Sequence, residues 1–282
     1  MTRSLMRRER KMKSKWLSGP YVLWMVLFTL IPLGVVFYYA CTDSLTGEFT
    51  LSNLASIIDY WPIFLSSIWL SIFATLICLV VGYPVAYYIA HCSPLKQRLL
   101  QMLIMLPMCM SFLLRTLAWV ALLDDTGIIN SFIGQFGIEP LPLIRNNGSV
   151  ILGMVYNYLP YMILPLYTVI MKIDHRLIEA AQDLGCNRRQ VFTKVTLPLS
   201  IPGIVSGITM VFVPAVSTFY ISQKLGSTDS FLIGDVIEMQ FKSAYNPNLG
   251  AALSLVLMVI IFVCVGVMNR FTSDDEESVV TI

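Results

Sequence analysis

The residues best suited to chemistry in this 282-residue chain are six cysteines, two histidines and one arginine inside an apolar stretch. The cysteines form no C-x-x-C pair, so their spacing indicates neither a metal site nor a disulfide framework. His91 and His175 each fall near the end of an apolar stretch, and no Ser/His/Asp set, phosphate-binding loop or carboxylate pair lies within one. The sequence therefore predicts no catalytic centre, no metal site and no cofactor.

Arg115 is the only charged residue within an apolar stretch, and a charge inside a membrane is costly unless other groups satisfy it. It lies 17 residues after Arg98, which is about 25 Å along a continuous helix. We expect Arg115 near the outer end of that helix, where it can reach water or pair with Asp124 or Asp125. Its positive charge repels a polycation and suits an anionic solute better.

Aromatic and amide side chains in the apolar stretches are candidates for contact with a solute. Aromatic faces attract ammonium groups without carrying a full charge. Such residues are also common as plain interfacial side chains of membrane helices. Consecutive helical residues point about 100° apart, so the two tyrosines of this set cannot both face one pathway squarely. The candidate pathway residues are Trp119, Tyr156, Asn157, Tyr158 and Tyr220.

The elements that position these residues follow from where charges are missing. An average soluble domain is about 45–50% apolar and about 25% charged, whereas this chain is 56% hydrophobic and only 13% charged. A membrane helix needs roughly 20 apolar residues, and the gaps between charges predict an all-α integral membrane protein with six transmembrane helices. The predicted spans are 16–42, 60–90, 99–123 (interrupted by Arg115), 146–171, 195–223 and 243–269.

Lysine and arginine residues set the orientation of the spans, because cytoplasmic loops are enriched in them. Seven occur in the first 15 residues, and placing that tail in the cytoplasm puts 15 inside and three outside. Both termini are therefore predicted to be cytoplasmic. We interpret the basic tail, 1–15, as a topological signal rather than a nucleic-acid-binding segment, and 16–42 as an uncleaved first helix.

The outer loops carry nine acidic and three basic residues, an excess that raises the local concentration of a polycation. The positive-inside rule alone also leaves that side acidic, so the charge count does not identify a cargo. Two of the acids, Asp235 and Glu238, are three apart on a short amphipathic segment. We expect them to be either a solvated helix face or contacts to an external binding protein.

The one long cytoplasmic connection, 172–198, holds the most informative pattern. Its first half is rich in helix formers and ends at Gly185, a residue type favoured just after a helix. Asn187 can cap a second short helix. The two helices would form a compact knob in which Ala180 and Ala181 let a partner approach the backbone closely. An amphipathic loop lying on the lipid surface is the alternative interpretation.

The spacing within this connection resembles the EAA signature of binding-protein-dependent ABC importer permeases. A Glu-Ala-Ala triplet is followed by three residues, a glycine, nine residues and then Val-x-Leu-Pro. In that family the motif forms a coupling helix that docks into a cleft of the cytoplasmic ATPase. The residues matched to the motif are Glu179, Ala180, Ala181, Gly185, Leu197 and Pro198.

Other passages resemble, more narrowly, the permease subunits of spermidine/putrescine importers. The resemblance implies the type I ABC importer permease fold, with the importer domain over 63–269. It also implies that the first helix is an addition to that domain and that 270–282 is a cytoplasmic C-terminal tail. The passages that carry it are 82–84, 111–115, 153–160, 219–222 and 232–237.

The resemblance implies a non-catalytic, multi-pass subunit of the bacterial inner membrane that imports polyamines by alternating access. Its implied partners are a cytoplasmic ABC ATPase dimer, which would hydrolyse ATP, a second permease subunit of a different chain, an extracytoplasmic solute-binding protein and membrane lipid. One alternative is an ABC permease for another small solute, such as a metal cation, thiamine or an anion like phosphonate. Another is a channel or facilitator, which would work without nucleotide.

Overall fold

The structure is a computed structural model in which helices make up almost all of the described chain. A single isolated bridge between Thr42 and Phe49 is its only β-type pairing among these residues. The all-α prediction is therefore confirmed, while the predicted basic tail lies outside the described residues. Those described are 20–43, 47–227 and 231–280.

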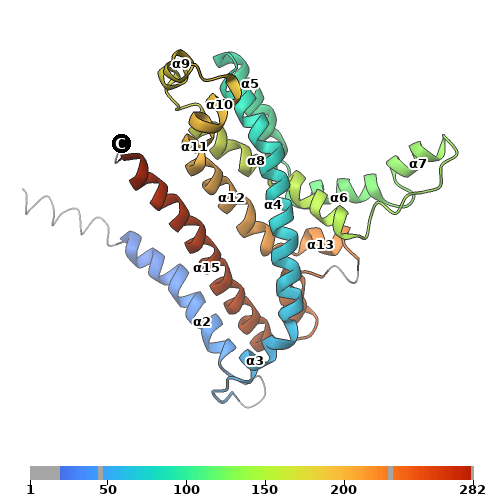
Figure 1. The fold of residues 1–282 in the computed structure, drawn as a ribbon. Coiled ribbons are helices and arrows are strands. Elements are labelled where there is room, and N and C mark those ends of the chain that lie inside the picture. The colour runs from blue at the N-terminus through green and yellow to red at the C-terminus, as the bar shows by residue number, and fades with distance from the viewer. Residues whose placement is uncertain (1–19, 44–46, 228–230, 281–282) are drawn as a thin grey trace, which may run out of the picture. The chain divides into compact units, whose positions relative to one another are not determined.

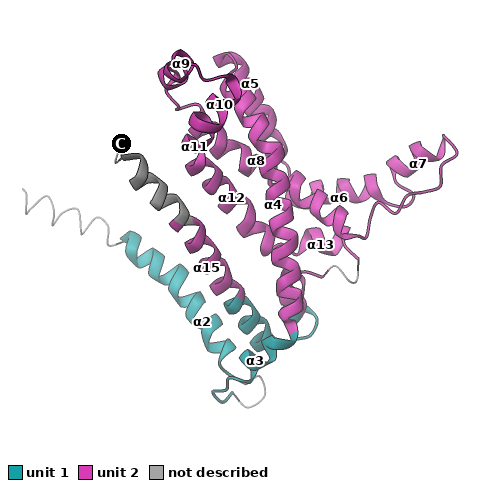
Figure 2. Cartoon of the chain, in the orientation of Figure 1, with its two compact units in different colours: residues 1–59, 240–256 teal, residues 60–239, 257–282 magenta. Residues whose placement is uncertain are grey.

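The chain divides into two compact units (Figure 2), of which the smaller comprises 1–59 and 240–256. Its first described helix runs from Pro20 to Ala40 and ends as α2 (Ile31–Ala40). Just after α2, the carbonyl of Thr42 accepts hydrogen bonds from two side-chain amides, Asn53 Nδ2 at 2.8 Å and Asn248 Nδ2 at 2.6 Å. That one oxygen therefore joins α2 to α3 (Ser52–Ala55) and to the beginning of α15 (Pro247–Val280).

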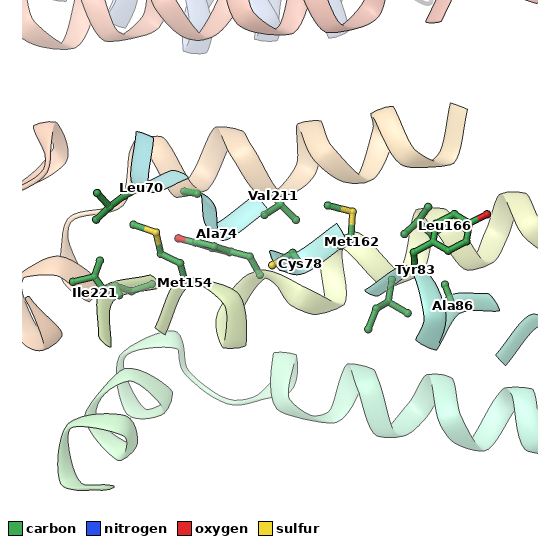
Figure 3. Close-up of a cluster of buried hydrophobic side chains, with 14 of the residues drawn as sticks. Leu70, Ala74, Cys78, Tyr83, Ala86, Met154, Met162, Leu166, Val211 and Ile221 are labelled. Atoms are coloured by element: carbon green, nitrogen blue, oxygen red, sulfur yellow. The ribbon is translucent and has the colours of Figure 1, made fainter. Parts of the chain in front are cut away.

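Three helices form the centre of the larger unit, which comprises 60–239 and 257–282. They are α4 (Trp61–Ala90), α8 (Asn147–Ile170) and α12 (Ile201–Val216), and each packs against the other two (Figure 1). Figure 3 shows the buried side chains that fill the space between them.

Close approach of these three helices depends on glycines, since lipid is as apolar as leucine and gives little drive for helix association. A Cβ atom at Gly82 of α4 would lie 3.0 Å from Cγ of Met162. A Cβ atom at Gly207 of α12 would lie 2.7 Å from Sδ of the same side chain. Met162 of α8, which is fully buried, therefore occupies space that both glycines leave open.

Within the described parts of the chain, four helices have the length and composition to cross a membrane, and the number rises to six if each of two bent helix pairs is one span. The first pair, Pro94–Cys109 and Phe112–Gly134, is bent by 89°. The second, Arg188–Leu199 and Ile201–Val216, is bent by 60°. The six predicted spans are thus represented, but the third and fifth are broken helices rather than continuous ones.

Proline and extended backbone account for both breaks. Pro107 lies in a short 3₁₀ turn, and Met110 and Ser111 then adopt extended ψ angles of 150° and 132°. At the second break the helix ends at Ser200, two residues before Pro202. Proline has no N–H to donate and its ring clashes with the carbonyl four residues earlier, so a helix bends or stops there.

The other helices of the larger unit, apart from α15, are shorter, and a hydrogen bond joins one of them to the start of α8. α8 begins at a capping box in which Asn146 Oδ1 accepts the Ser149 N–H at 2.8 Å. Ser149 Oγ also donates to the Leu225 carbonyl at 2.7 Å, which ties α8 to the end of α13. Apart from the short helices between α8 and α12, the remaining ones are α5 (Pro94–Met105), α6 (Phe112–Leu123), α7 (Ile128–Gly134), α13 (Tyr220–Leu225) and α14 (Ile233–Lys242), whose last residues belong to the smaller unit.

Gly153→Ala should destabilise the packing of α8 against α13. The new Cβ would lie 2.5 Å from Leu225 Cδ1 and 2.9 Å from Ile221 Cγ2, and overpacking of this kind costs about 1–3 kcal/mol. Thermal unfolding of the purified protein in detergent should give a lower melting temperature. Gly34→Ala is the control, because no described atom lies within 4 Å of its Cβ position. Equal melting temperatures for the two variants would contradict this packing.

Candidate functional site

The segment that carries the EAA-like motif begins with α9 (His175–Asp183). Asp174 caps this helix, since its Oδ1 accepts the Arg176 N–H at 3.0 Å. The helix ends at Asp183 with Leu184 as its C-cap. Gly185 follows with a φ of +84°, which is strained for residues with a side chain, and an N–H that donates to the Gln182 carbonyl at 2.9 Å. The predicted end of the first short helix, with Gly185 just after it, is therefore confirmed.

A second helical stretch follows in three short parts. These are α10 (Arg188–Val191), a π-helical segment (Phe192–Thr196) and α11 (Leu197–Leu199). Asn187 caps the stretch through a reciprocal pair of bonds, its Oδ1 accepting the Gln190 N–H at 2.9 Å and its own N–H donating to Gln190 Oε1 at 2.8 Å. The predicted N-cap at Asn187 is confirmed.

The motif residues lie largely on the surface of this segment. Leu184, immediately before Gly185, is 86% exposed, so a large apolar side chain points outward beside two alanines. Exposed apolar side chains within a charged surface are typical of a docking site for another protein. Glu179, Ala180, Gly185 and Pro198 are exposed, and Ala181 and Leu197 are half-buried.

Arg115 lies on α6 and is only 7% exposed. Among the described residues, its Nε and Nη1 atoms have no hydrogen-bond partner. The sequence predicts that Arg115 either reaches water or pairs with Asp124 or Asp125. Among the described residues it is instead buried and forms no ion pair with either acid, and Asp125 lies 3.9 Å from Arg145. The physical reason is the 89° bend before α6, because α6 then packs against α8 and α13 and no longer continues α5 outward.

Two ring pairs join α6 to its neighbours. Trp119 meets Tyr156 of α8 with ring centroids 5.3 Å apart and planes at 73°. Phe112 lies 6.2 Å from Tyr220 of α13. The ring of this tyrosine also interacts with a cation of the same chain, because Lys224 Nζ lies over it at 5.9 Å from the ring centroid. The structure thus brings Trp119 and Tyr156 together and gives Tyr220 separate partners.

The other two candidate pathway residues lie inside the helix bundle. Tyr158 is 8% exposed, and its hydroxyl donates to the Pro214 carbonyl of α12 at 3.3 Å. Asn157 is 1% exposed and donates from Nδ2 to the Gly153 carbonyl at 2.9 Å. Tyr156 remains 38% exposed. The two tyrosines therefore point to different surroundings, as the helical geometry predicts, and only Tyr156 is accessible in this conformation.

Asp235 is not on an outer face, which corrects the expectation from the sequence. It is 2% exposed, and its Oδ2 accepts the Leu232 N–H at 2.8 Å where α14 begins. The next N–H, that of Ile233, donates to Ser67 Oγ of α4 at 2.7 Å. The carboxylate and the serine thus satisfy two backbone donors that a helix start leaves unpaired. Because the residue three positions earlier is Leu232 and not Ser or Thr, the sequence lacks the full capping-box signature that could have indicated this cap.

Burial raises the pKa of Asp235 from 3.8 to about 6. The hydrogen bond from Leu232 opposes this rise, and the nearby Glu238 carboxylate adds to it. Glu238 itself is half-buried and accepts a hydrogen bond from Gln223 Nε2 of α13. The two acids therefore differ in role, since Asp235 caps α14 and Glu238 bridges to α13.

Comparison with known proteins identifies the family. Residues 82–273 match the family described as binding-protein-dependent transport system inner membrane component. The chain belongs to this family. It is 35% identical over 246 residues to the spermidine/putrescine transport system permease protein PotB of Escherichia coli (strain K12), covering 84% of this chain and 90% of that relative. The family match includes the motif segment and every candidate pathway residue.

Solved structures show the same fold. A bacterial ABC transporter involved in the import of the acidic polysaccharide alginate matches with a TM-score of 0.78 at 16% identity, covering 96% of this chain and 99% of that chain. The alginate transporter in complex with its alginate pentasaccharide-bound periplasmic protein matches with a TM-score of 0.74 at 17% identity, covering 95% and 96%. The architecture is therefore that of ABC importer permeases.

Asp235→Asn should remove part of the pH dependence of stability. The folded pKa of about 6 exceeds the ordinary 3.8, so the folded state binds the proton more tightly than the unfolded state. This stabilisation is complete below the ordinary pKa and is lost as pH rises through the folded pKa. As the pH rises from about 4.5 to about 7, the melting temperature of the wild type should therefore fall relative to that of the variant, whose amide stays neutral.

Thermal unfolding in detergent at several pH values measures this difference. Asp125→Asn is the matched control, because that carboxylate is 59% exposed. If the melting temperatures of the wild type and Asp235→Asn differ by the same amount throughout the range, protonation of Asp235 is not linked to folding.

Proposed function

We propose that this chain is the transmembrane subunit of an ATP-driven importer whose 172–198 segment docks on a cytoplasmic ATPase. The observation that carries the proposal is the exposure of Glu179, Ala180 and Gly185 on a capped, compact pair of helices. Family membership supports it, since the matched region, 82–273, contains these residues. The distribution of 15 basic residues inside against three outside supports cytoplasmic termini and a cytoplasmic motif segment.

In this proposal the chain contributes no catalysis, and ATP is hydrolysed by a separate ATPase dimer. Closure of that dimer would move the motif segment and alternate the access of the bundle between the two sides of the inner membrane. A second permease subunit, a different chain, completes the pathway. A binding protein delivers the solute from outside, which is supported by the alginate transporter in complex with a periplasmic protein.

We infer that the solute is a polyamine. The relative that shares 35% of its residues is a spermidine/putrescine permease. Aromatic rings can bind the ammonium groups of a polyamine by cation–π attraction, and an interaction of this type occurs within this chain, where the Lys224 ammonium lies over the Tyr220 ring. The ring pair of Trp119 and Tyr156 is half-exposed and offers a second aromatic surface.

Arg115 favours a second candidate, an importer of an anionic solute. Its guanidinium is buried in a membrane helix, and two of its nitrogen atoms, Nε and Nη1, have no hydrogen-bond partner among the described residues. A guanidinium binds carboxylates and phosphates well and repels ammonium groups. One of the solved structures of this fold belongs to a transporter of an acidic polysaccharide.

Glu179→Lys and Gly185→Asp should each lower ATP-dependent uptake by about tenfold or more, because the first reverses a contact charge and the second strains the helix end. Uptake by membrane vesicles is measured alongside the amount of permease in the membrane, which should stay unchanged. Glu139→Lys, a charge reversal at an exposed residue outside the motif segment, is the control. Normal uptake by Glu179→Lys at a normal amount of protein would exclude the coupling role.

Radiolabelled spermidine should accumulate in proteoliposomes that contain the complete importer, ATP and binding protein, and unlabelled putrescine should compete for it. Phosphonate and other small anions should leave uptake unchanged. Inhibition by anions without inhibition by amines would support the anionic candidate. Accumulation without nucleotide would instead indicate a channel or facilitator.

A further inference from the structure

Three aromatic rings meet where the motif segment joins the helix bundle. Phe192, the first residue of the π-helical segment, lies with its ring centroid 5.7 Å from that of Tyr83 and with the planes at 89°. The same ring lies 5.8 Å from Tyr87, with the planes at 82°. Both tyrosines belong to α4 and are four residues apart, so they lie on one face in successive turns. Phe192 therefore makes edge-on contacts with two turns of α4 at once.

Tyr83 also holds the other end of the same stretch of chain. Its hydroxyl lies 2.9 Å from Ser200 Oγ, and both residues are buried. Ser200 Oγ uses its own proton to donate to the Leu197 carbonyl at 2.8 Å. A serine hydroxyl has only one proton, so Tyr83 is the donor to Ser200. One tyrosine thus contacts Phe192 through its ring and Ser200 through its hydroxyl.

The stretch between these two contacts is the part of the connection most able to deform. It consists of a π-helical segment, Phe192–Thr196, followed by α11 and the 60° bend at Ser200. π-Helical turns and proline-associated bends are the usual places where helices yield. Because Tyr83 fixes both ends, this stretch cannot change length or direction without moving α4.

A second polar link near this end of the bundle, between α8 and α5, does not involve the motif segment. Tyr167 of α8 donates to Gln97 Oε1 of α5 at 3.2 Å, and Gln97 in turn donates to the carbonyls of Ala90 and Cys92. That link fastens α5 and α8 to the end of α4. The contacts of Phe192 and Ser200 therefore link this end of the connection directly to α4, beside Leu197, which also packs against the buried core.

We propose that Tyr83, Tyr87 and Phe192, here named the aromatic junction, make α4 move with the motif segment, so that displacement of α9 and α10 reaches the transmembrane bundle. Phe192 and Tyr83 are positioning residues in this role, because each would act through the position of α4. The inference rests on the proposed docking of the motif segment on an ATPase. The inference adds that the covalent connection from the motif segment into α12 is too deformable to transmit the movement by itself.

The first test measures whether the two elements move as one body. Spin labels are attached through Tyr88→Cys on α4 and Arg176→Cys on α9, both exposed positions, in a variant without the six native cysteines. Pulsed electron paramagnetic resonance on the complete importer in nanodiscs gives the distance between the labels with and without ATP and vanadate. The distribution should be narrow and unchanged by nucleotide, whereas Phe192→Ala should broaden or shift it.

Phe73→Ala is the matched control, because it removes a similar edge-on ring pair on α4, with Trp69 at 5.0 Å and 86°, that has no contact with the motif segment. This variant should behave as the wild type. The proposal is overturned if Phe192→Ala keeps the narrow distribution, or if nucleotide changes the distance in the wild type as much as in the variant. The readout needs no solute, so it stands whatever the importer carries.

The second test measures spermidine transported per ATP hydrolysed in proteoliposomes. Phe192→Ala should lower this ratio by roughly 3- to 30-fold, the range expected for loss of a coupling contact, while ATP hydrolysis continues. Phe192→Tyr keeps the ring and should restore the ratio. Tyr83→Phe keeps the ring but loses the hydrogen bond to Ser200, so it should give an intermediate value.

The outcomes separate the two proposals. An unchanged ratio in Phe192→Ala overturns the aromatic junction and leaves the importer function intact. A wild-type complex that hydrolyses ATP without moving spermidine overturns the polyamine assignment, and the label distances then decide the aromatic junction on their own.

Discussion

A backbone N–H or carbonyl group left without a hydrogen bond in hydrocarbon costs several kcal/mol, so a membrane helix can break only where the chain itself supplies new partners. At the second break the Ser200 N–H donates to the Thr196 carbonyl at 3.0 Å, and the Ser200 hydroxyl takes up the Leu197 carbonyl. At the first break the Arg115 N–H donates to the Ser111 carbonyl at 3.1 Å. Backbone bonds thus resume directly after each break, although no side chain caps the start of α6 at Ser111.

Features that depend on neighbouring residues could be predicted from the sequence. The spans follow from uncharged gaps, and the helix end at Gly185 and the cap at Asn187 follow from local backbone chemistry. Arg115 and Asp235 could not be placed in the same way. The site of Arg115 depends on the 89° bend, and that of Asp235 on a helix start that packs against Ser67 of α4.

The polar contacts toward the two ends of α4 illustrate how few hydrogen bonds organise a helix bundle in lipid. Toward one end Ser67 accepts the Ile233 N–H that begins α14, and toward the other Tyr83 donates to Ser200. Between them the contacts are apolar and close, with Met162 of α8 next to Gly82. A helix fixed by hydrogen bonds at both ends and by shape in the middle can tilt as a rod, which is the kind of movement alternating access requires.

The contact between Lys224 and Tyr220 has a consequence for any amine that reaches this part of the chain. That ring face is already occupied by an ammonium group of the protein, one helical turn away. An incoming amine would therefore exchange with Lys224 rather than fill a vacant place, and its net gain in free energy would be small. A solute held by exchange is bound weakly and leaves easily, which suits a protein that must pass its cargo on rather than keep it.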